Sequence, residues 1–573
     1  MRGAESDGAP AGPPTRSPDA GAVALRDAAG PFVRPLQRVV RGLATGSHTI
    51  PELVALSGAP RREVEQILAA LAPDLERDGD RHALPEALRA AYAELFDLPD
   101  LDARPFDDVV GTLLAGRPDL VAFLEGLAGS RPRPLRDLDH VAATPVTVAR
   151  RALWLDASFD LARTEVLCLG DHDLTSLGIA ACTRGARIAV VDVDDRVLDF
   201  VDGVARRHGW SVRCLWGDLR LGLPVSTHRS AGLVVTDPPY TPDGISTFLV
   251  AGLQGLADGE RGRLVVAYGY GDHQPALGLT VQHEMLDLHL VVEAVLPGFN
   301  RYQGAQAIGS RSDLYVLRPT ARTWRALPGL AGREAGRIYT HGSRSVESRA
   351  EPAGAALEQA MARAAGAAGT DPGPLLLVGD RWPGPAGAGV ERTSLGAVLA
   401  RGLPRPLRGR DQVRCLVDLT EAPPAWFLRA LLALDVAWLG AVVPAGVGAR
   451  GDVATAADLL RDRYRLRRES FPAGRFDLVV ATPAGAGSRI ARDALRRAHG
   501  RLGNAWREAL IAAAGEQGGR LTKNEARGIV ERFSPRPDLT DLRLVEAPRH
   551  LLELAVTQLR ASQDHLAMRA AAR

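Results

Sequence analysis

Between residues 146 and 325 the chain repeats one pattern, in which a short apolar run ends in a polar loop and a stretch with helical spacing follows. The runs are TEVLCLGD, RIAVVDVD, SVRCLWGD, AGLVVTDPP, GRLVVAYG and DLYVLRP. Nearly continuous apolar runs of this length are typical of strands that are buried on both faces, and their alternation with helices predicts a parallel sheet. We therefore predict an α/β domain with a Rossmann-like, doubly wound sheet over residues 146–325.

The length of the chain requires further domains. At roughly 100 to 200 residues per domain, 573 residues suffice for three or four domains. Residues 1–30 are rich in Pro, Gly, Ala and Ser, which predicts a disordered tail. Residues 31–95 predict a winged-helix-like domain, in which one helix begins after Thr49 and has Glu52 as its capping partner. Residues 96–145 are predicted to be a helical linker.

The region after residue 325 predicts a second, degenerate α/β unit and a helical end. Residues 326–370 have the Gly, Ala and Arg content of a linker, and the apolar runs LLLVGD, VRCLVDL, WLGAVVPA and FDLVVATP predict a second α/β domain over residues 371–490. FDLVVATPAGAG resembles LVVTDPPYTPDG, which suggests a duplication, but it lacks the acidic residues, and we assign this domain no chemistry. Residues 491–573 have an amphipathic helical pattern, and we expect them to pack against the rest of the chain or to form a homodimer.

Composition limits where the function can reside. Lys+Arg 70 against Asp+Glu 68 leaves a formal charge of +2, so any electrostatic function must be local. The four cysteines, Cys168, Cys182, Cys214 and Cys415, lack the paired spacing of a disulfide framework or a zinc site, and we predict no metal. The first residues lack the apolar stretch of a secretory signal, and no later run has the length of a membrane span. We expect a cytoplasmic protein that binds no membrane.

The winged-helix-like domain raises the question of nucleic-acid binding. Its third helix carries Glu63 and Glu65 beside Arg61 and Arg62. Because carboxylates would meet phosphates poorly, the sequence favours a packing or dimerisation role and leaves DNA binding as the alternative.

Acidic residues gather where four of the predicted strands end. These ends are Gly170-Asp171-His172-Asp173, then Asp192, then Gly217-Asp218, and finally Asp237-Pro238-Pro239-Tyr240. In open α/β sheets the ligand site lies beyond the carboxyl ends of the strands, and an acid about 20 residues after the first loop can bind ribose hydroxyls. Asp192 has this offset, and Asp218 could then bind an adenine amine. A lone aspartate in such a position commonly caps a helix, but four together favour an adenosine site.

The first loop distinguishes between two classes of adenosine cofactor. A loop that binds a pyrophosphate or a carboxylate is rich in glycine, because backbone N–H groups must approach the anion. This loop instead combines Gly170 with Asp171 and Asp173. Carboxylates there would repel an anion and attract a sulfonium that carries a free amine, so the loop favours a polycationic ligand.

Asp-Pro-Pro-Tyr alone resembles the motif of amino-methyltransferases, but a wider set of motifs resembles another family. LCLGDHDLTSLGIA, AVVDVDDRVLDFV, GDLRLGLP, VVTDPPYT and GFNRYQGA together resemble the branched-chain polyamine synthases, the bis(aminopropyl)spermidine synthase family, over about residues 31–320. The resemblance implies transfer of an aminopropyl group from decarboxylated S-adenosylmethionine to spermidine, with release of methylthioadenosine. In the family's Gly-Asp-Asp-Asp and Asp-Pro-Pro-Glu segments, His172 and Tyr240 here replace acids.

The chemistry of the transfer suggests roles for Asp173 and Asp237, the acids that match the family's two segments. The attacking amine must be unprotonated, whereas an aliphatic amine has a pKa of about 10.4. We predict that Asp173 binds the ammonium and accepts its proton, and that Asp237 and the Pro239 carbonyl orient the nitrogen for in-line attack. His172 is either a second base or a polar loop residue, and Tyr240 either stacks on the acceptor or lies in the core.

Further candidates bind the donor or cover the substrate. Gly170, Asp171, Asp192, Asp218 and Pro238 are the predicted cofactor-binding residues. The resemblance alone adds Asn300 and Tyr302, in GFNRYQGA, as substrate-binding residues on a flexible loop.

Three functions compete at this point. The first is an aminopropyltransferase that uses decarboxylated S-adenosylmethionine and a polyamine or polyamine-like amine. The second is an S-adenosylmethionine-dependent amino-methyltransferase, which Tyr240 favours and the acidic first loop disfavours. The third is a regulator that senses a polyamine and binds DNA.

Overall fold

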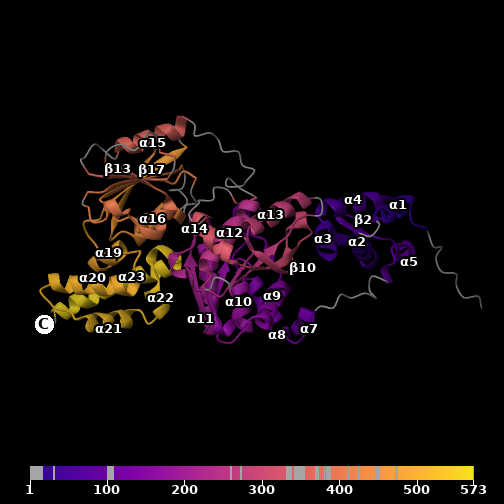
Figure 1. Cartoon of the computed structure of the whole chain (residues 1–573), viewed down its shortest axis with the longest axis horizontal. Helices are drawn as coiled ribbons and strands as arrows, with labels where there is room; N and C mark the ends of the chain where they lie inside the picture. The colour runs from indigo at the N-terminus through magenta and orange to yellow at the C-terminus, as the bar shows by residue number, and fades with distance from the viewer. Residues whose placement is uncertain are drawn as a thin grey trace, which may run out of the picture.

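The chain is a mixed α/β protein built around three sheets. A computed structural model describes residues 17–29, 33–99, 109–257, 261–271, 274–330, 338–340, 355–367, 373–379, 381–382, 389–410, 412–421, 425–445, 452–470 and 475–571. Within these residues the sheets have three, eight and six strands. They follow one another along the long axis of the molecule, from the N-terminal domain to the C-terminal region (Figure 1).

The N-terminal domain combines short helices with the three-stranded sheet, in the order β1-β3-β2. The predicted capping box is confirmed, since the Thr49 side chain accepts from the Glu52 backbone and the Glu52 side chain accepts from the Thr49 backbone. The elements are α1 (Ala20–Ala29), α2 (Arg34–Thr45), β1 (His48–Thr49), α3 (Ile50–Ser57), α4 (Arg61–Leu71), β2 (Glu76–Asp78), β3 (Arg81–Ala83) and α5 (Glu86–Leu95).

The predicted disordered tail is wrong for residues 20–29, which form α1. The Asp19 side chain accepts from the Gly21 backbone at 2.8 Å, and the Asp19 N–H donates to Asp74 at 2.6 Å. Ala22 is fully buried against the helices of this domain. A short apolar stripe on an alanine-rich helix was enough to offset its ordering entropy; residues 1–16 and 30 lie outside the described residues.

The predicted helical linker contains two helices and one strand. These are α7 (Val109–Ala115), α8 (Pro118–Ala128) and β4 (Ala142–Ala143), while residues 100–108 lie outside the described residues. Because β4 pairs with the eight-stranded sheet at Tyr302 and Gln303, the end of this segment is part of the next domain.

The eight-stranded sheet has the order β4-β10-β11-β9-β8-β5-β6-β7. Strands β7, β6, β5, β8 and β9 are parallel to one another, whereas the pairs β9–β11, β11–β10 and β10–β4 are antiparallel. All six predicted runs form strands, whereas β10 was missed because Pro297 and Gly298 interrupt its apolar pattern at a bulge. The elements are α9 (Pro145–Ser158), β5 (Glu165–Leu169), α10 (Thr175–Cys182), β6 (Arg187–Asp192), α11 (Asp195–His208), β7 (Ser211–Trp216), β8 (Leu233–Thr236), α12 (Pro242–Gly255), β9 (Arg263–Tyr268), α13 (Pro275–Asp287), β10 (Val291–Gln303), β11 (Arg311–Arg318) and α14 (Ala321–Leu330).

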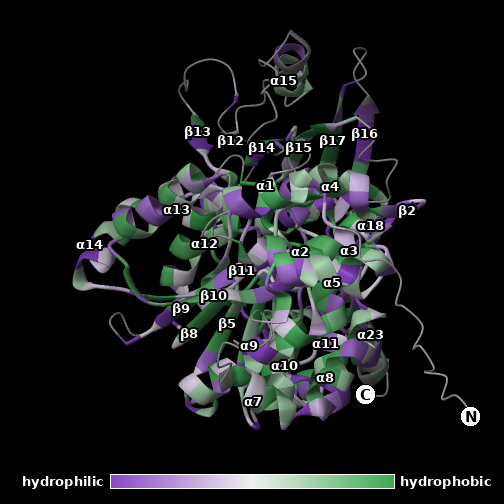
Figure 2. Cartoon of the chain, turned by 90° about the vertical axis from the view of Figure 1, so that its right-hand side faces the viewer, coloured by the Kyte–Doolittle hydropathy of each residue, from purple (hydrophilic) through white to green (hydrophobic). Residues whose placement is uncertain are grey.

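Helices cover both faces of this sheet, as a Rossmann-like fold requires. Alternate strand residues point to opposite faces, so Leu167 and Leu169 of β5 pack with α12 and α13, and Val166 and Cys168 pack with α10 and α11. The strands are largely hydrophobic, and the N-terminal helices lie in front of the sheet's β10 side in this view (Figure 2).

The six-stranded sheet has the order β13-β12-β14-β15-β17-β16. β17 is antiparallel to β15, whereas β8 is parallel to both neighbours, so the similar runs in β17 and β8 do not occupy equivalent places. The likeness reflects two buried strands of similar composition. The elements are β12 (Leu375–Val378), β13 (Val390–Thr393), α16 (Leu395–Arg401), β14 (Arg414–Asp418), α17 (Ala425–Ala433), β15 (Trp438–Pro444), α18 (Asp452–Leu459), β16 (Tyr464–Ser470) and β17 (Phe476–Pro483).

The predicted linker over residues 326–370 contributes to both neighbouring domains. Helix α15 (Ala355–Ala367) buries Ala360 and Met361 against the six-stranded sheet, so this part is not a linker. Residues 331–337, 341–354 and 368–370 lie outside the described residues.

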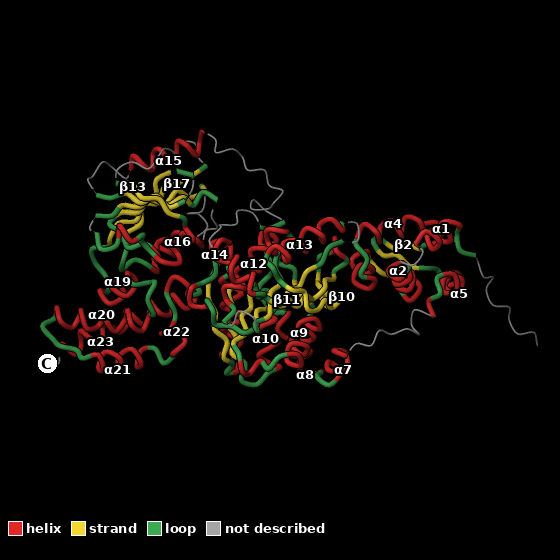
Figure 3. Tube along the Cα trace, viewed as in Figure 1, coloured by secondary structure: helices red, strands yellow, loops and turns green. Residues whose placement is uncertain are grey.

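The C-terminal region is helical, as predicted (Figure 3). Arg536 and His550 both contact Asp202 of α11, at 2.9 Å and 3.3 Å, so these helices pack against the eight-stranded domain as well. Within the part of the chain that the structure describes, no helix has the length and apolar character needed to cross a membrane. The elements are α19 (Arg489–Arg496), α20 (Leu502–Glu516), α21 (Lys523–Phe533), α22 (Pro537–Asp541) and α23 (Arg549–Ala571).

Candidate functional site

A cavity of about 260 Å³ lies at the carboxyl ends of β5, β6, β7 and β8. Adjacent strands β5 and β8 are the point where the order of strands reverses, which is where ligands bind in open α/β sheets. Most of the predicted site residues line this cavity: Gly170, His172, Asp173, Asp192, Asp218, Asp237, Pro238, Pro239, Tyr240 and Tyr302. The structure therefore brings most of the predicted site residues together at one cavity.

The first loop is a tight turn with two residues in the left-handed region. Gly170 has φ +68° and lies beside the Phe248 ring, where a Cβ would be 3.4 Å from the nearest ring atom. Leu174 has φ +66°, which is unusual for a bulky residue and is tolerated here because its side chain is buried. The turn buries both acids of the loop, and of the two only Asp173 lines the cavity.

Asp171 has the contacts of a helix-capping residue. Its carboxylate accepts from the Ser176 backbone at 3.0 Å and from the Ser176 hydroxyl, at the start of α10. Burial raises the pKa of Asp171 well above its usual value. The prediction that Asp171 binds the cofactor is not supported by these contacts, because the side chain is committed to α10 while Gly170 and His172 line the cavity.

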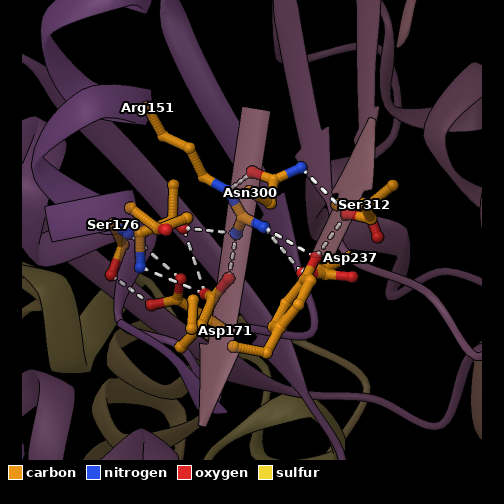
Figure 4. Close-up of polar contacts among 12 residues, drawn as sticks. Arg151, Asp171, Ser176, Asp237, Asn300 and Ser312 are labelled. Atoms are coloured by element: carbon orange, nitrogen blue, oxygen red, sulfur yellow. Dashed lines mark hydrogen bonds and ion pairs between the residues drawn. The ribbon is translucent and has the colours of Figure 1, made fainter. Parts of the chain in front are cut away.

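Arg151 of α9 is the residue around which the site is organised (Figure 4). Its guanidinium donates to Asp173, to Asp237 at 2.7 Å and to the Asn300 amide oxygen at 2.7 Å. Only 3% of the Arg151 side chain is exposed. Although burial disfavours the cation, Asp173 and Asp237 raise the pKa of Arg151 well above its usual value, so the guanidinium stays charged.

Sequence reasoning missed Arg151, although the helix that carries it contained a signal. Val148, Arg151 and Leu155 are spaced at three and four residues and share the buried face of α9. A charged residue on an apolar helix face must have a buried counter-charge. The acids Asp173 and Asp237 were already identified, and this pairing could have been predicted.

Asp237 is the centre of a hydroxyl network. Its two oxygens accept from Tyr240 at 3.0 Å and from Tyr302 at 2.8 Å, and the two tyrosine hydroxyls are 2.8 Å apart. The Tyr302 hydroxyl also contacts Ser312 at 2.7 Å. Burial raises the pKa of Asp237, with Arg151 opposing the shift. A carboxylate with a raised pKa accepts a proton more readily than an exposed one.

Asn300 and Tyr302 lie in the core of the site, and the predicted flexible loop is wrong for both. They are on β10, where Asn300 is fully buried and Tyr302 is 5% exposed. The Asn300 amide donates to Ser312 at 3.0 Å and thereby fixes the oxygen that accepts from Arg151. The sequence missed the strand, so it placed these residues on a covering loop instead of in the sheet.

Asp192 is buried at the end of β6 and, among the described residues, forms no ion pair with an arginine. It accepts from the backbone N–H groups of Asp171 at 2.9 Å and Asp194 at 2.8 Å. Burial raises the pKa of Asp192 to about 7 despite these bonds. Asp194 differs, because hydrogen bonds from Arg196 lower its pKa against the effect of burial. Asp192 is therefore the acid in this part of the cavity that can bind a neutral hydroxyl.

Asp218 is held by residues from both α/β domains. It accepts from the Arg220 guanidinium at 2.6 Å and from the indole N–H of Trp426, on α17 of the second domain, at 3.0 Å. The Arg220 guanidinium lies over the Trp426 ring and the Tyr339 ring, at 4.9 Å and 5.6 Å from their centroids. Since Tyr339 also lines the cavity, the region after residue 326 helps to build this end of the site.

His172 forms a stacked pair with His140, which sequence reasoning missed. The ring centroids are 4.3 Å apart with an interplanar angle of 13°. Burial lowers the pKa of His172 to about 4, and burial together with His172 lowers the pKa of His140 to about 3. Among the described residues, neither ring nitrogen of His172 has a hydrogen-bond partner. Both rings are neutral at pH 7, and His172 offers a donor and an acceptor to a ligand.

The Pro239 carbonyl approaches the first turn of α12. A Cβ at Gly244 would be 2.6 Å from this oxygen, so Gly244 is needed for the close approach. This contact gives the Pro239 carbonyl a structural role and does not support the predicted orientation of a substrate nitrogen.

The acidic loops are largely neutralised by arginine. Asp194 pairs with Arg196, Asp218 pairs with Arg220, and Arg151 is shared by Asp173 and Asp237. The group of Arg151 with its two acids thus has a formal charge of −1. The predicted trap for a polycation becomes a site that can balance one positive charge at the reacting centre.

Comparison with known proteins identifies a domain around this cavity. Residues 119–326 match the family model described as the branched-chain polyamine synthase A C-terminal domain. An uncharacterised protein of Methanocaldococcus jannaschii is 34% identical over 191 residues, which are 33% of this chain and 48% of that protein. N(4)-bis(aminopropyl)spermidine synthase of Thermus thermophilus is 33% identical over 196 residues, 34% of this chain and 56% of that enzyme.

A solved structure has the same family name. The crystal structure of the branched-chain polyamine synthase from Thermus thermophilus, in complex with N4-aminopropylspermidine and 5'-methylthioadenosine, aligns with 23% identity and a TM-score of 0.39. The alignment covers 57% of this chain and 97% of that one. The chain spans about half the length of the curated relatives it matches. The resemblance that the motifs predicted is therefore confirmed over residues 119–326, which match the model of the branched-chain polyamine synthase A C-terminal domain.

Proposed function

We propose that the chain transfers an aminopropyl group from decarboxylated S-adenosylmethionine to an amine acceptor of the polyamine kind, with release of methylthioadenosine. The observation that carries the proposal is the convergence of Asp173 and Asp237 on Arg151 at the ligand-binding edge of a domain of this family. The curated relative from Thermus thermophilus is named for a reaction of this class.

The donor would occupy the end of the cavity formed by β6 and β7. Asp192 would accept hydrogen bonds from the ribose hydroxyls, and Asp218 would accept one from the adenine amine. Arg220 and Trp426 donate to Asp218 and fix the direction of its carboxylate. Gly170 and Pro238 would contact the adenosine through their backbone and ring, since both line the cavity.

The acceptor would lie against Asp237, Tyr240 and Tyr302. Its nitrogen attacks the methylene bonded to the sulfonium, the new C–N bond forms as the C–S bond breaks, and the electron pair of that bond stays on the sulfur of methylthioadenosine. The proton of the nitrogen passes to a carboxylate. We assign this role to Asp237 in preference to Asp173, because burial raises the pKa of Asp237 and its tyrosine partners can rearrange.

Asp173 would then act as a positioning residue. One oxygen accepts from Arg151, and the other accepts from the Thr175 hydroxyl at 3.0 Å and its backbone at 3.3 Å. These bonds occupy the carboxylate and fix Arg151 against Asp237. The combined charge of −1 suits an acceptor with one ammonium at the reacting end, and the neutral His172 suits a hydroxyl or amide nearby.

A second candidate, amino-methyl transfer from S-adenosylmethionine, is favoured by one observation. The acids of the loops, which were expected to repel the carboxylate of that donor, are matched by Arg196, Arg220 and Arg151. The repulsion is therefore weaker than the sequence alone predicts. Asp-Pro-Pro-Tyr is also compatible with this chemistry.

A thermal-shift titration distinguishes the two candidates. Methylthioadenosine, S-adenosylmethionine and decarboxylated S-adenosylmethionine are each added to the full chain with and without spermidine or a monoamine that carries a hydroxyl. A ligand that binds only the folded chain raises the melting temperature with its concentration. We expect the decarboxylated donor to stabilise the protein more than its parent, and mass spectrometry to detect an acceptor heavier by one aminopropyl group.

The opposite ranking would support the methyltransferase, and product heavier by one methyl group would establish it. Binding of none of the three adenosine compounds, together with binding of spermidine, would favour the polyamine-sensing regulator. Asp237→Asn serves as the control that binds the donor and forms product at least about a hundredfold more slowly.

For the N-terminal domain we propose a winged-helix arrangement with a packing or dimerisation role. The order α2, β1, α3, α4, β2, β3 supports it, and α4 places Glu65 in an ion pair with Arg61 at 2.8 Å. Sedimentation of the full chain tests the proposed homodimer, and a titration with duplex DNA tests the alternative.

A further inference from the structure

A second cavity, of about 510 Å³, lies between the N-terminal domain and the eight-stranded sheet. It is lined from one side by Arg38 of α2 and by Gly58 and Pro60, which join α3 to α4. From the other side it is lined by Arg301 of β10 and by Arg311 and Asp313 of β11, with further residues of the neighbouring turns. None of the residues that we assigned to the transfer reaction is among these lining residues.

The cavity carries a net positive charge. Among the residues that the structure describes, three arginines and one aspartate line it, which gives a formal charge of +2. The Arg301 guanidinium donates to the backbone oxygens of Gly298 and Asn300, and Asp313 accepts from the Gly298 N–H at 2.6 Å. Burial and the nearby guanidiniums of Arg311 and Arg38 lower the pKa of Arg301. Like charges that repel one another in a concave site would be stabilised by an anion.

The two domains meet at the cavity through a close backbone contact that fixes its shape. A Cβ at Gly309 would be 2.0 Å from the Gly58 carbonyl oxygen, and a Cβ at Gly58 would be 3.0 Å from the Arg311 side chain. Gly58 also has φ +71°, in the left-handed region. The Arg61 guanidinium adds a hydrogen bond to Gln306 at 2.8 Å across the same junction. The arginines are therefore held on opposing walls by a close-packed junction.

The arrangement fits a small multivalent phosphate better than other anions. One arginine guanidinium can donate hydrogen bonds to two phosphate oxygens at once. Several arginines around one cavity therefore suit an ion with more than one negative charge. A cavity of this volume is in the range of small-ligand sites. A DNA duplex would also meet the carboxylate of Glu65 on the adjacent α4, which disfavours it.

We propose that this cavity, formed by Arg38, Arg301, Arg311 and Asp313, is a binding site for a small oligophosphate such as a diphosphate or triphosphate group. The site is distinct from the aspartate-lined cavity, although Ile308 lines both and β10 passes between them. Asn300 and Tyr302 face Arg151, while the intervening Arg301 lines the phosphate cavity. The proposal does not depend on which group the enzyme transfers.

Calorimetric titration of the full chain with inorganic pyrophosphate tests the proposal at constant ionic strength. We expect saturable binding at one site, and we expect Arg311→Gln to weaken it about tenfold, the usual effect of removing one charge-assisted pair. Arg301→Gln with Arg311→Gln should abolish it. The matched control is Arg187→Gln, an exposed arginine at the start of β6 in the same sheet, which should bind like the parent chain.

Asp313→Asn keeps an oxygen for the Gly298 N–H and removes the one carboxylate of the cavity, so we expect it to bind pyrophosphate more tightly. This variant keeps the test informative if the double substitution fails to fold. Equal binding by the parent, Arg311→Gln and Arg187→Gln would overturn the proposal, as would no binding by the folded parent chain. Preference for a short DNA duplex over pyrophosphate would also overturn it, because the phosphate would then belong to nucleic acid.

Discussion

The eight-stranded and six-stranded sheets are made of similar buried strands, yet their polar ends are arranged differently. In the first sheet β5, β6 and β8 are parallel, so Gly170, Asp192 and Asp237 follow strand ends at one edge. In the second sheet β17 is antiparallel to β15, so its polar end lies away from the end of β14. A cluster of acids requires strands that end on the same side, which the apolar pattern of each strand does not specify.

The two sheets also differ in how an aspartate at a strand end is neutralised. Asp418 ends β14 and pairs with Arg381, whose side chain is 31% exposed, whereas Arg151 is 3% exposed and is shared by two acids. Because Arg381 is partly exposed, water stabilises part of its charge and the protein need not supply every partner. The buried trio keeps two carboxylates in a cavity away from water and makes them available for chemistry.

Removal of the two arginines should give the largest contrast between the sheets. Arg151→Met leaves Asp173 and Asp237 buried without a counter-charge, and we expect it to destabilise the fold by about 3–5 kcal/mol and to abolish transfer. Arg381→Met should cost less, about 1 kcal/mol, because the Arg381 side chain is 31% exposed and the buried Asp418 keeps two hydrogen bonds from Thr420. Urea unfolding followed by tryptophan fluorescence measures both. Equal losses would contradict the contrast, and Arg151→Lys provides a folded variant if Arg151→Met is insoluble.

Substitution of the aspartates tests whether chemistry belongs to the first sheet alone. We expect Asp237→Asn to lower kcat by about 10²–10⁴, the usual contribution of a positioned base, with little change in donor binding. Asp418→Asn should leave kcat unchanged. A steady-state assay of methylthioadenosine release checks both variants, and comparable losses in the two would place the chemistry elsewhere.

The neutral residues at the edge of the first sheet should determine the acceptor. His172→Asp with Tyr240→Glu restores two acids, and we expect kcat/KM for spermidine to rise about tenfold relative to a monoamine, since one added charge contact in a partly buried site has this size. The ratio of kcat/KM values for the two acceptors is the measurement. No change in the ratio would show that these positions do not contact the acceptor.

Asp192, which forms no ion pair with an arginine among the described residues, should make the binding of methylthioadenosine depend on pH. Burial raises the pKa of Asp192 to about 7, and ribose hydroxyls donate best to its ionised form. Affinity for methylthioadenosine should therefore rise about tenfold from pH 6 to pH 8, as ionisation increases. The same raised pKa means that Asp192 stabilises the fold at low pH and loses this contribution as pH rises toward 7. Titration at both pH values checks this, and Asp192→Asn should be independent of pH.

The smallest effect is expected where the two α/β domains meet. Trp426→Phe keeps an aromatic ring under Arg220 and removes the N–H that donates to Asp218. A lost hydrogen bond of about 1 kcal/mol corresponds to roughly fivefold weaker donor binding. KM for the donor should rise while kcat stays constant. A change in kcat alone would assign Trp426 a different role.

Local sequence determined which residues could form the site, and part of what each would do. Strand runs with polar ends predicted β5, β6 and β8, and Asp192 and Asp237 were correctly placed at the cavity. The same reasoning placed Asp171 at the cofactor, where the structure shows a helix-capping contact, and it placed Asn300 on a loop. The sequence indicated neither the capping contact of Asp171 nor the strand position of Asn300, because side-chain direction depends on neighbours that are distant in sequence.

The sequence by itself determined the parallel sheet, the acidic strand ends and the family resemblance, because apolar periodicity and short motifs are local properties of the chain. Only the tertiary structure decided that Arg151 neutralises Asp173 and Asp237, that Trp426 reaches Asp218, and that an arginine-lined cavity lies at the domain junction. Residues 22 to 208 positions apart meet in these contacts. The net charge of a site depends on which residues, distant in sequence, pair within it. No local sequence pattern specifies these pairs.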